Sequence, residues 1–272
     1  MPQSWFIWKG KNSREMGLWV SHLPPEARAA ERVKNIKVPG RSGSLTLLEG
    51  DNVYESQLLE CTVTARRGIS YGQVLDWLSG SGDLILSSSP NRARTARISG
   101  EVLFDAVSND LCQAEIPFFC EPLKKQFPQE ADIQDSGGAP YVIFHPGTVP
   151  SKPLVRFGLI GGSQTLQIGT RSMSFSAAAF QTTKEYNIGD HVSYGGALYR
   201  FNTTHAVGIW NANHVNEVTA LTVDCEAQII YSNYGIYTGG YTGQFWEIPV
   251  GNCTVFASSN VRPTITPRWR WR

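Results

Sequence analysis

Apolar and polar residues alternate with a period of two in several short segments of this 272-residue chain. This alternation is the feature that most limits its fold, because successive side chains of a β-strand point to opposite faces. In "LECTVTAR" (59–66) the apolar positions share one face, and "LCQAEIPFFC" (111–120) repeats the pattern. The residues on the expected buried face of the first segment are Leu59, Cys61, Val63 and Ala65. We therefore predict a mainly β fold.

The composition agrees with many short strands and turns. Glycine, proline and aromatic residues are plentiful, heptad patterning is absent, and charged residues make up only 17% of the chain. Lys and Arg number 24 against 23 Asp and Glu, so the net charge of +1 favours neither nucleic acid nor an anionic membrane as a partner. The length is sufficient for two domains.

No targeting, membrane or metal-binding signal is found in the sequence. The N-terminal "MPQSWFIWKGKNSREMGLWV" does not have the pattern of a signal peptide, and no apolar run approaches the ~20 residues of a membrane span. The five cysteines are scattered and form no Cys-x-x-Cys pair. We expect buried thiols in a protein folded in reducing cytoplasm, with no cofactor and no metal.

One helix is predicted, at the start of "SYGQVLDWLSGSGDLILSS" (70–88). Ser70 and Gln73 have the spacing of a capping box, and Gly80 supplies a left-handed residue after the last turn. The apolar face of this helix is expected to contain Val74, Leu75 and Leu78. A strand at 84–86 and a hairpin with the turn "VSND" (107–110) follow.

The composition changes between residues 124 and 151, where Pro, Gly and polar residues indicate a linker or a crossing arm. Beyond it the chain is β again, and residues 221–229 alternate as one half-buried strand. We predict a first domain over 1–145 and a second, β-sandwich domain over 146–272. In the final "PRWRWR", Trp269 and Trp271 are expected to point inward.

No catalytic motif is complete. "GRSGS" (40–44) lacks the last glycine and the strand–turn–helix context of a nucleophile elbow, and no pair of carboxylates stands out as a glycosidase pair. "NRARTARISG" (91–100) suggests either a nucleic-acid strip or a charged edge or interface strand. We favour the strand, because no aromatic residues are interleaved for base stacking. We expect a protein that is not an enzyme.

The order of segments resembles the distal tail proteins of long, non-contractile-tailed bacteriophages. A strand beginning at Gly17 and Leu18 is followed by "HLPPEARAAERVKNIK", "VPGRSGSL" and "LDWLSGSGDLILSSSPNR". The series continues with "EIPFFCEP", "FHPGTVPSKPLVRF", "LTVDCEAQIIY", "IPVGNCTV" and "ITPRWR". The resemblance spans nearly the whole chain apart from about 180–220.

The resemblance implies a hub at the distal end of the virion tail, made in the host bacterial cytoplasm. In this family the first domain forms a hexameric ring through which DNA passes, and a galectin-like β-sandwich extends outward from it. The ring joins the tail tube protein to the tail-tip or tail-associated lysin protein, with no membrane and no sequence-specific nucleic acid among its partners. Arms reaching a neighbouring copy are expected at Pro24–Pro25 and at 124–151.

Residues 183–219 interrupt the second domain and resemble chitin-type carbohydrate-binding modules of phage tail and host-recognition proteins. The matching pattern is "Y-x-x-G-D-x-V-x-Y-x-G-x-L-Y" from Tyr186 to Tyr199, followed by "GIWN" (208–211). A unit of this size without cysteine needs aromatic side chains for its own core. The alternatives are therefore packing or sugar stacking, and Val192, Leu198 and Tyr199 are assigned to packing.

The resemblance makes host cell-wall polysaccharide a candidate ligand of this insert. The candidate carbohydrate-binding residues are Tyr186, Tyr194, Trp210, Asn211 and His214. If they form the principal site, the chain is a host-glycan-binding adhesin of the tail tip and not mainly a hub. A glycan hydrolase is the third and weakest alternative.

Overall fold

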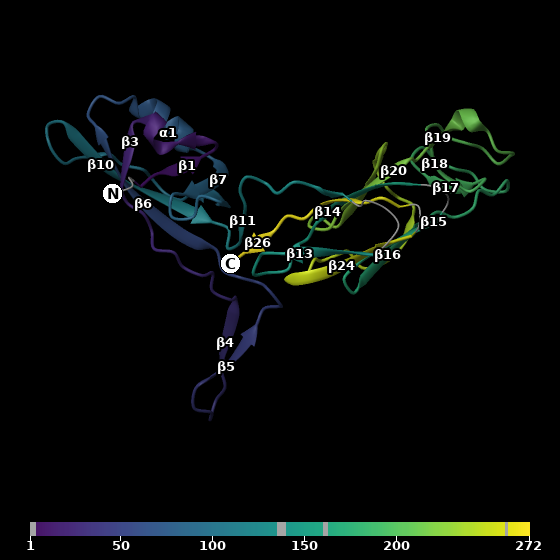
Figure 1. Cartoon of the computed structure of the whole chain (residues 1–272), viewed down its shortest axis with the longest axis horizontal. Helices are drawn as coiled ribbons and strands as arrows, with labels where there is room; N and C mark the ends of the chain where they lie inside the picture. The colour runs from purple at the N-terminus through teal and green to yellow at the C-terminus, as the bar shows by residue number, and fades with distance from the viewer. Residues whose placement is uncertain (1–3, 135–139, 160–162, 259–260) are drawn as a thin grey trace. The chain divides into compact units, whose positions relative to one another are not determined.

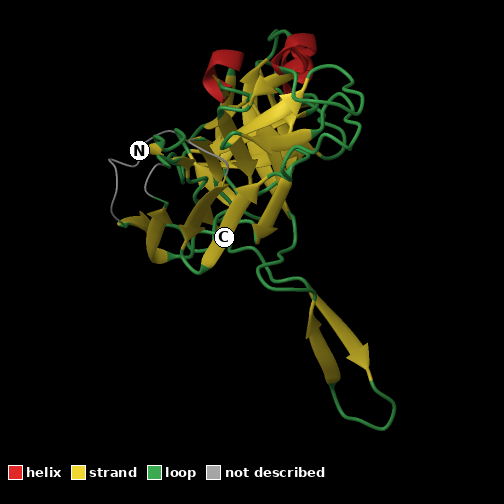
Figure 2. Ribbon diagram, turned by 90° about the vertical axis from the view of Figure 1, so that its right-hand side faces the viewer, coloured by secondary structure: helices red, strands yellow, loops and turns green. Residues whose placement is uncertain are grey.

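The computed structural model describes residues 4–134, 140–159, 163–258 and 261–272. These residues are mainly β-strand with one α-helix, which confirms the predicted fold class (Figures 1 and 2). The chain divides into two compact units. Unit 1 comprises Met1–Gln129 together with Arg270–Arg272, and unit 2 comprises Glu130–Trp269.

The boundary of the two units differs from the predicted boundary after residue 145. Strands β12 (Ile133–Gln134) and β13 (Tyr141–His145) pair with strands of unit 2. Strand β26 (Arg270–Trp271) instead pairs with β11 (Lys124–Gln126) of unit 1. Backbone pairing therefore decides the boundary, and the composition of 124–151 did not reveal it.

Unit 1 is built on a sheet with the order β2-β1-β7-β8-β10-β6-β3, extended by β9 beside β10 and by β11 beside β8. The long strands β6 and β10 are antiparallel and in register from Gln57↔Cys120 to Arg66↔Leu111. The strands of this sheet other than β11 and β26 are β1 (Phe6–Trp8), β2 (Lys11–Asn12), β3 (Leu18–His22), β6 (Gln57–Arg66), β7 (Ser81–Leu86), β8 (Arg92–Ile98), β9 (Asp105–Ala106) and β10 (Leu111–Cys120).

Helix α1 (Tyr71–Leu78) and the short 3-10 helix Ser13–Met16 complete unit 1. Val74 and Leu78 are buried, but Leu75 is exposed, so the helix buries a narrower stripe than predicted. The predicted capping box is wrong, because the Ser70 side chain makes no capping hydrogen bond. Gly80 does have the expected positive φ, at 74°.

Strand β8 lies inside the sheet, between β7 and β10, and not at its edge. The prediction that it is a charged edge strand is therefore wrong. Arg94 is buried and donates a hydrogen bond to Gln57 Oε1, while Arg92 lies 3.9 Å from the ring centroid of Trp271. Arg97 lies 5.0 Å from the ring centroid of Phe119. These guanidinium groups are used in packing within unit 1.

Unit 2 contains two sheets whose inner faces pack on each other, as the 5.1 Å separation of the Phe157 and Phe175 rings shows. One sheet has the order β12-β25-β14-β20-β21-β22, and the other β13-β24-β15-β16-β23. Their remaining strands are β14 (Leu154–Gly158), β15 (Ser163–Ile168), β16 (Arg171–Ser176), β20 (Ala220–Asp224), β21 (Ile229–Ser232), β22 (Gly235–Ile236), β23 (Gly240–Gly243), β24 (Gly251–Ala257) and β25 (Thr264–Thr266).

The alternating segment 221–229 is not one strand but a hairpin, β20 and β21. Asp224 Oδ1 accepts hydrogen bonds from the backbone N–H groups of Glu226 and Ala227, both at 3.0 Å, and Gln228 has a φ of 56°. The aspartate side chain thus organises a turn in the middle of an unbroken alternation.

The described cysteines and C-terminal tryptophans agree with the predictions. The five cysteines are free and buried. Trp269 and Trp271 are buried, the first in unit 2 and the second in unit 1.

Candidate assembly and ligand-binding surfaces

A hairpin of unit 1, formed by β4 (Val33–Lys37) and β5 (Ser44–Leu48), has an apolar face that no other described element of the unit covers. Among the described residues these strands pair only with each other, and no other element of unit 1 lies beside them in Figures 1 and 2. Cross-strand pairs place Lys34, Ile36, Leu45 and Leu47 on one face. Leu45 and Leu47 are 39% and 44% exposed.

The base of this hairpin is held firmly. The Arg32 guanidinium lies 3.4 Å from the Glu55 carboxylate and 4.0 Å from that of Glu49. Backbone hydrogen bonds join Arg32 N to Val53 O (3.0 Å) and Glu49 N to Arg32 O (3.1 Å). The apolar face is therefore presented to solvent on a defined base. Sequence reasoning did not predict this hairpin, although "VKNIK" and "SLTLL" around "PGRSG" carry a recognisable hairpin signal.

The predicted arm at Pro24–Pro25 is folded onto its own unit. The Glu26 carboxylate accepts hydrogen bonds from the hydroxyl groups of Ser88 (3.2 Å) and Ser89 (2.6 Å) and pairs with Lys124. Partial burial raises the pKa of Glu26, but the bonds from Lys124 and the two serines outweigh it and lower the pKa to about 2. These bonds hold the arm on its own unit, and its contact with a neighbouring copy stays a prediction.

The described parts of the other predicted arm, 124–151, are likewise used inside the chain. Strand β11 pairs with β8 and β26, β12 with β25, and β13 with β24. Residue 151 forms a further bridge to Ile248. Residues 135–139 of this segment lie outside the described residues.

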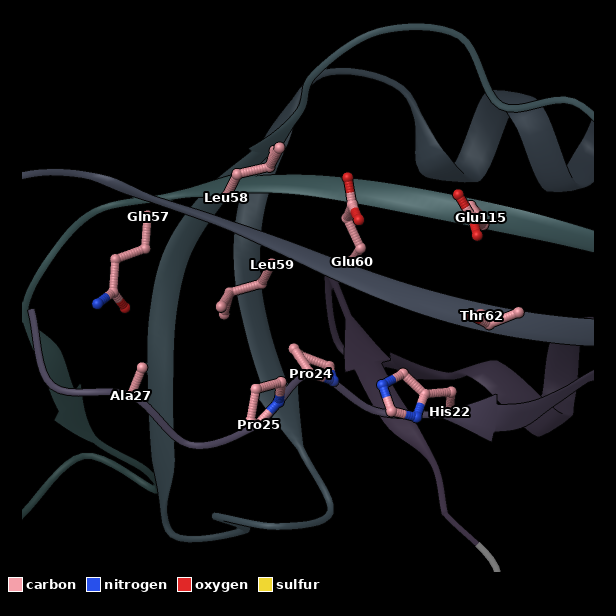
Figure 3. Close-up of a pocket in the computed structure, with 10 residues that line it drawn as sticks. All are labelled: His22, Pro24, Pro25, Ala27, Gln57, Leu58, Leu59, Glu60, Thr62 and Glu115. Carbon is pink, nitrogen blue, oxygen red and sulfur yellow. The ribbon is translucent and has the colours of Figure 1, made fainter.

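A cavity of about 520 Å³ opens between β6 and the arm that carries Pro24 and Pro25 (Figure 3). Strand β3 pairs with β6 only from Thr62 to Ala65, because β3 ends at His22, the partner of Thr62. The edge of β6 over 57–61 therefore has no strand partner on this side among the described residues. Proline has no N–H group, so Pro24 and Pro25 cannot supply the missing donors.

In unit 2, the insert forms a three-stranded sheet, β17 (His191–Tyr194), β18 (Ala197–Phe201) and β19 (Val215–Glu217). Tyr186 and Phe201 stack at 4.7 Å with an interplanar angle of 9°. Tyr186 is only 2% exposed, and its hydroxyl accepts a hydrogen bond from Gln181 N at 2.8 Å. Tyr186 is therefore a core residue, and its predicted role in carbohydrate binding is wrong.

Tyr194 and Trp210 form the one stacked pair of the insert that reaches solvent in the described structure. Their ring centroids are 4.1 Å apart, with an interplanar angle of 13°, and Tyr194 is 44% exposed. Trp210 is half-buried and also contacts the edges of Phe180 and Tyr199. Trp210 therefore supports Tyr194, which also lies 5.9 Å from the Phe180 ring and remains 44% exposed.

Asn211 and His214 serve mainly an internal hydrogen-bond chain. Asn211 Oδ1 accepts from Asn213 N (3.0 Å), which orients the amide so that its Nδ2 donates to His214 Nε2 (3.1 Å). His214 Nδ1–H then donates to His205 Nδ1 at 2.9 Å. Both ring nitrogens of His214 are thus used within the insert.

A separate contact ties the insert to the sandwich. The Thr238 hydroxyl donates to Gly189 O (3.0 Å), so it accepts from the His191 Nδ1–H group at 2.8 Å. Burial, with a further contribution from Arg200, lowers the pKa of His191 to about 4. The buried site therefore favours the neutral imidazole, whose Nδ1–H group makes this contact.

Within the described residues, no three His, Cys, Asp or Glu side chains are grouped so that they could hold a metal ion. The described helices include none with the length and apolar character of a membrane span.

Comparison with solved structures gives a match over the full length of the chain. The crystal structure of the SPP1 Dit (gp 19.1) protein, described as a paradigm of the hub adsorption apparatus in Gram-positive infecting phages, aligns with a TM-score of 0.60. The alignment covers 98% of this chain and 99% of that chain at 11% sequence identity, so the shared property is the fold. No family model matches the chain, and no curated protein matches it by sequence.

Proposed function

We propose that this chain is a structural hub protein of a phage tail. The observation that carries the proposal is the correspondence of the complete fold, both units included, with a phage hub protein. A fold shared at 11% identity does not by itself transfer a function, so the proposal also needs a feature of this chain that fits an assembly.

The uncovered hairpin β4–β5 is that feature. An isolated two-stranded hairpin is marginally stable in water, and an exposed apolar face on it promotes association. Another copy of the chain would supply the missing cover. We propose that the hairpin docks on a different surface of that copy, which makes the contact heterologous and repeats it until the ring closes. We propose a hexamer with a central opening for DNA.

In this role the ring joins the tail tube protein to the tail-tip or tail-associated lysin protein at the distal end of the virion tail. Unit 1 forms the ring, and the galectin-like sandwich of unit 2 extends from it. The cytoplasm of the bacterial host is the place of synthesis and assembly.

The test is the mass of the purified full chain by light scattering and native mass spectrometry, with negative-stain images of the particles. We expect rings of six copies of the 30.0 kDa chain. A compact monomer at every concentration up to the millimolar range would contradict the hub proposal.

A second candidate function is binding of host cell-wall glycan by the insert, in a tail-tip adhesin. It is favoured by one observation, the Tyr194–Trp210 stack, in which Tyr194 remains 44% exposed. The β17–β18 turn consists of Gly195 and Gly196, both with positive φ, so no side chain of the turn stands beside that stack. Such a flat aromatic platform suits a sugar ring.

The glycan proposal is tested by sedimentation of the full chain with purified bacterial cell walls. Tyr194→Ala should reduce binding about tenfold, whereas the matched control Tyr241→Ala, also 44% exposed but in the sandwich, should leave it unchanged. Trp210→Ala is a poorer probe, because it removes part of the insert core. Equal binding by both tyrosine variants would leave the insert without a glycan role.

A further inference from the structure

We propose that the hairpin of one copy docks on the outer face of strands β6 and β10 of the next copy, beside the unpaired edge of β6. This inference rests on the proposed ring and names its two contact surfaces. The donor surface is the hairpin face with Lys34, Ile36, Leu45 and Leu47. The acceptor surface is formed by Leu58, Glu60, Glu115 and Phe119.

The acceptor surface lacks cover in two ways. The edge of β6 over 57–61 has no strand partner on the side of β3 in the described part of the chain, and a cavity of about 520 Å³ separates it from the proline-containing arm. Figure 3 shows that Leu58 and Glu60 point to the same side of β6, opposite to Leu59. An extended segment can therefore approach both the backbone edge and the outer face.

The outer face offers apolar contacts to such a segment. Leu58 and Phe119 are directly opposite in register and are 53% and 36% exposed. One side of Phe119 is approached by Arg97, the only basic group that contacts this pair in the described structure. A pair of large exposed apolar side chains on neighbouring strands matches the apolar residues of the hairpin in kind and in size.

The same face is acidic where it borders the cavity. Glu60 is opposite Pro117 and Glu115 is opposite Thr62, so the two carboxylates occupy diagonal positions of one sheet face. Both line the cavity, which has no Lys or Arg among its described lining residues. Two like charges at diagonal positions repel each other, and a bound cation relieves that repulsion.

The hairpin carries the opposite charge. Residues 33–48 contain Lys34, Lys37 and Arg41 and no acidic residue. Lys34 lies on the apolar face itself, beside Leu47, so apolar and electrostatic contacts coincide. Complementary charge of this kind selects one partner surface and one orientation.

The acceptor belongs to another copy and not to the hairpin's own chain. The ion pairs of Arg32 and the bridge between Glu31 and Tyr54 fix the base of the hairpin, and its apolar face is exposed in the described structure. Since donor and acceptor are different surfaces, each copy offers one of each, as a closed ring requires.

The experiment uses paired charge reversals in the full chain. We expect Lys34→Glu to raise the concentration for half-assembly at least tenfold, because the docking face of the hairpin then carries a carboxylate toward an acidic face. Glu60→Lys/Glu115→Lys should have the same effect, with a basic face meeting basic hairpins. The control Lys11→Glu/Lys152→Glu reverses two exposed lysines elsewhere and should assemble as the wild type does. Circular dichroism of each variant separates misfolding from loss of assembly.

Mixing is the decisive measurement. The two reversed variants, each defective alone, should form rings with alternating copies when combined in equal amounts, since each then meets a face of opposite charge. Failure of the mixture to recover assembly overturns the inference, and so does normal assembly of either variant alone. In both cases wild-type rings would still support the hub proposal. A wild type that never assembles overturns the hub proposal and this inference together.

As a second readout, Leu47→Cys and Leu58→Cys chains should cross-link with each other under mild oxidation only in the assembled state. Absence of the cross-linked dimer in assembled rings would contradict the docking described here.

Discussion

Two small β units of this molecule, the hairpin β4–β5 and the insert β17–β19, differ in how they treat their apolar side chains. Both are too small to bury much surface. The insert turns Tyr186 and Phe201 inward around Val192 and closes a core of its own. The hairpin has an apolar face of similar character, but Leu45 and Leu47 remain in contact with water.

The difference shows which unit needs a partner. A unit that buries its aromatic residues can be added to a scaffold and removed again without exposing other parts of the chain. A unit that leaves its aliphatic residues uncovered suits one half of an interface, and in the proposed ring its stability would depend on the other half.

The strongest test of this comparison removes each unit in turn. Replacing residues 34–47 by a short Gly-Ser turn should abolish assembly, and the monomer should remain folded. Replacing residues 183–217 by a similar linker should leave assembly unchanged. Light scattering of both variants measures the outcome. Loss of rings on removal of the insert would reverse the assignment.

The next largest effect concerns the core of the insert. Phe201→Ala removes a fully buried ring that stacks on Tyr186 and should cost about 3–5 kcal/mol of local stability. Hydrogen exchange of amides in β17 and β18 measures this loss. Ile188→Ala, at an exposed side chain of the same insert, should change stability by about 0.5 kcal/mol or less. Similar effects of both variants would show that the insert has no packed core.

A pH titration should loosen the insert from the sandwich. His191 has a pKa of about 4 in the folded protein against 6.5 for the free side chain, so folding keeps it neutral. The stability is complete above pH 6.5 and is lost as the pH falls toward 4. The difference corresponds to on the order of 3 kcal/mol.

His191→Gln should flatten the pH dependence of hydrogen exchange around Gly189 and Thr238. His22→Gln, at an exposed side chain of unit 1, is the control and should leave this dependence as it is. An unchanged slope in His191→Gln would mean that another group carries the transition.

The smallest effect is expected at the arm. With the pKa of Glu26 lowered to about 2 from 4.5, its carboxylate stabilises the arm above pH 4.5, and this contribution is lost as the pH falls through about 2. Because the side chain is 42% exposed, Glu26→Gln should cost about 1 kcal/mol or less. Proteolysis near Pro24–Pro25 reports release of the arm, and assembly should persist. Rings that fail in Glu26→Gln would restore the arm as an assembly element.

Much of the fold could be predicted from the sequence, because alternation reports directly on which strand face is buried. Strands β6 and β10 follow their pattern residue by residue. The same reasoning failed at 221–229, where the Asp224 side chain forms a turn without interrupting the alternation. It failed at β8, whose arginines pack on Trp271 and Phe119 from distant parts of the chain.

The candidate sites were less predictable, because they depend on contacts between residues far apart in the sequence. Nothing near Glu26 indicates that Lys124 would hold the arm. Tyr186 and Tyr194 are both tyrosines of one motif, yet the first is in the core and the second at the surface. The exposed hairpin was missed because its sequence indicates two paired strands. The sequence does not show whether another layer of the fold covers these strands.

The pairing of β11 with β26 sets an order of events during synthesis. Lys125 pairs with Arg270, and unit 2 lies between these two residues in the sequence. All of unit 2 is therefore translated after Lys125 and before Arg270. At about 5–20 residues per second, the first sheet waits several seconds on the ribosome for its last strand. A nascent chain therefore completes the sheet of unit 1 only after all of unit 2 has been translated.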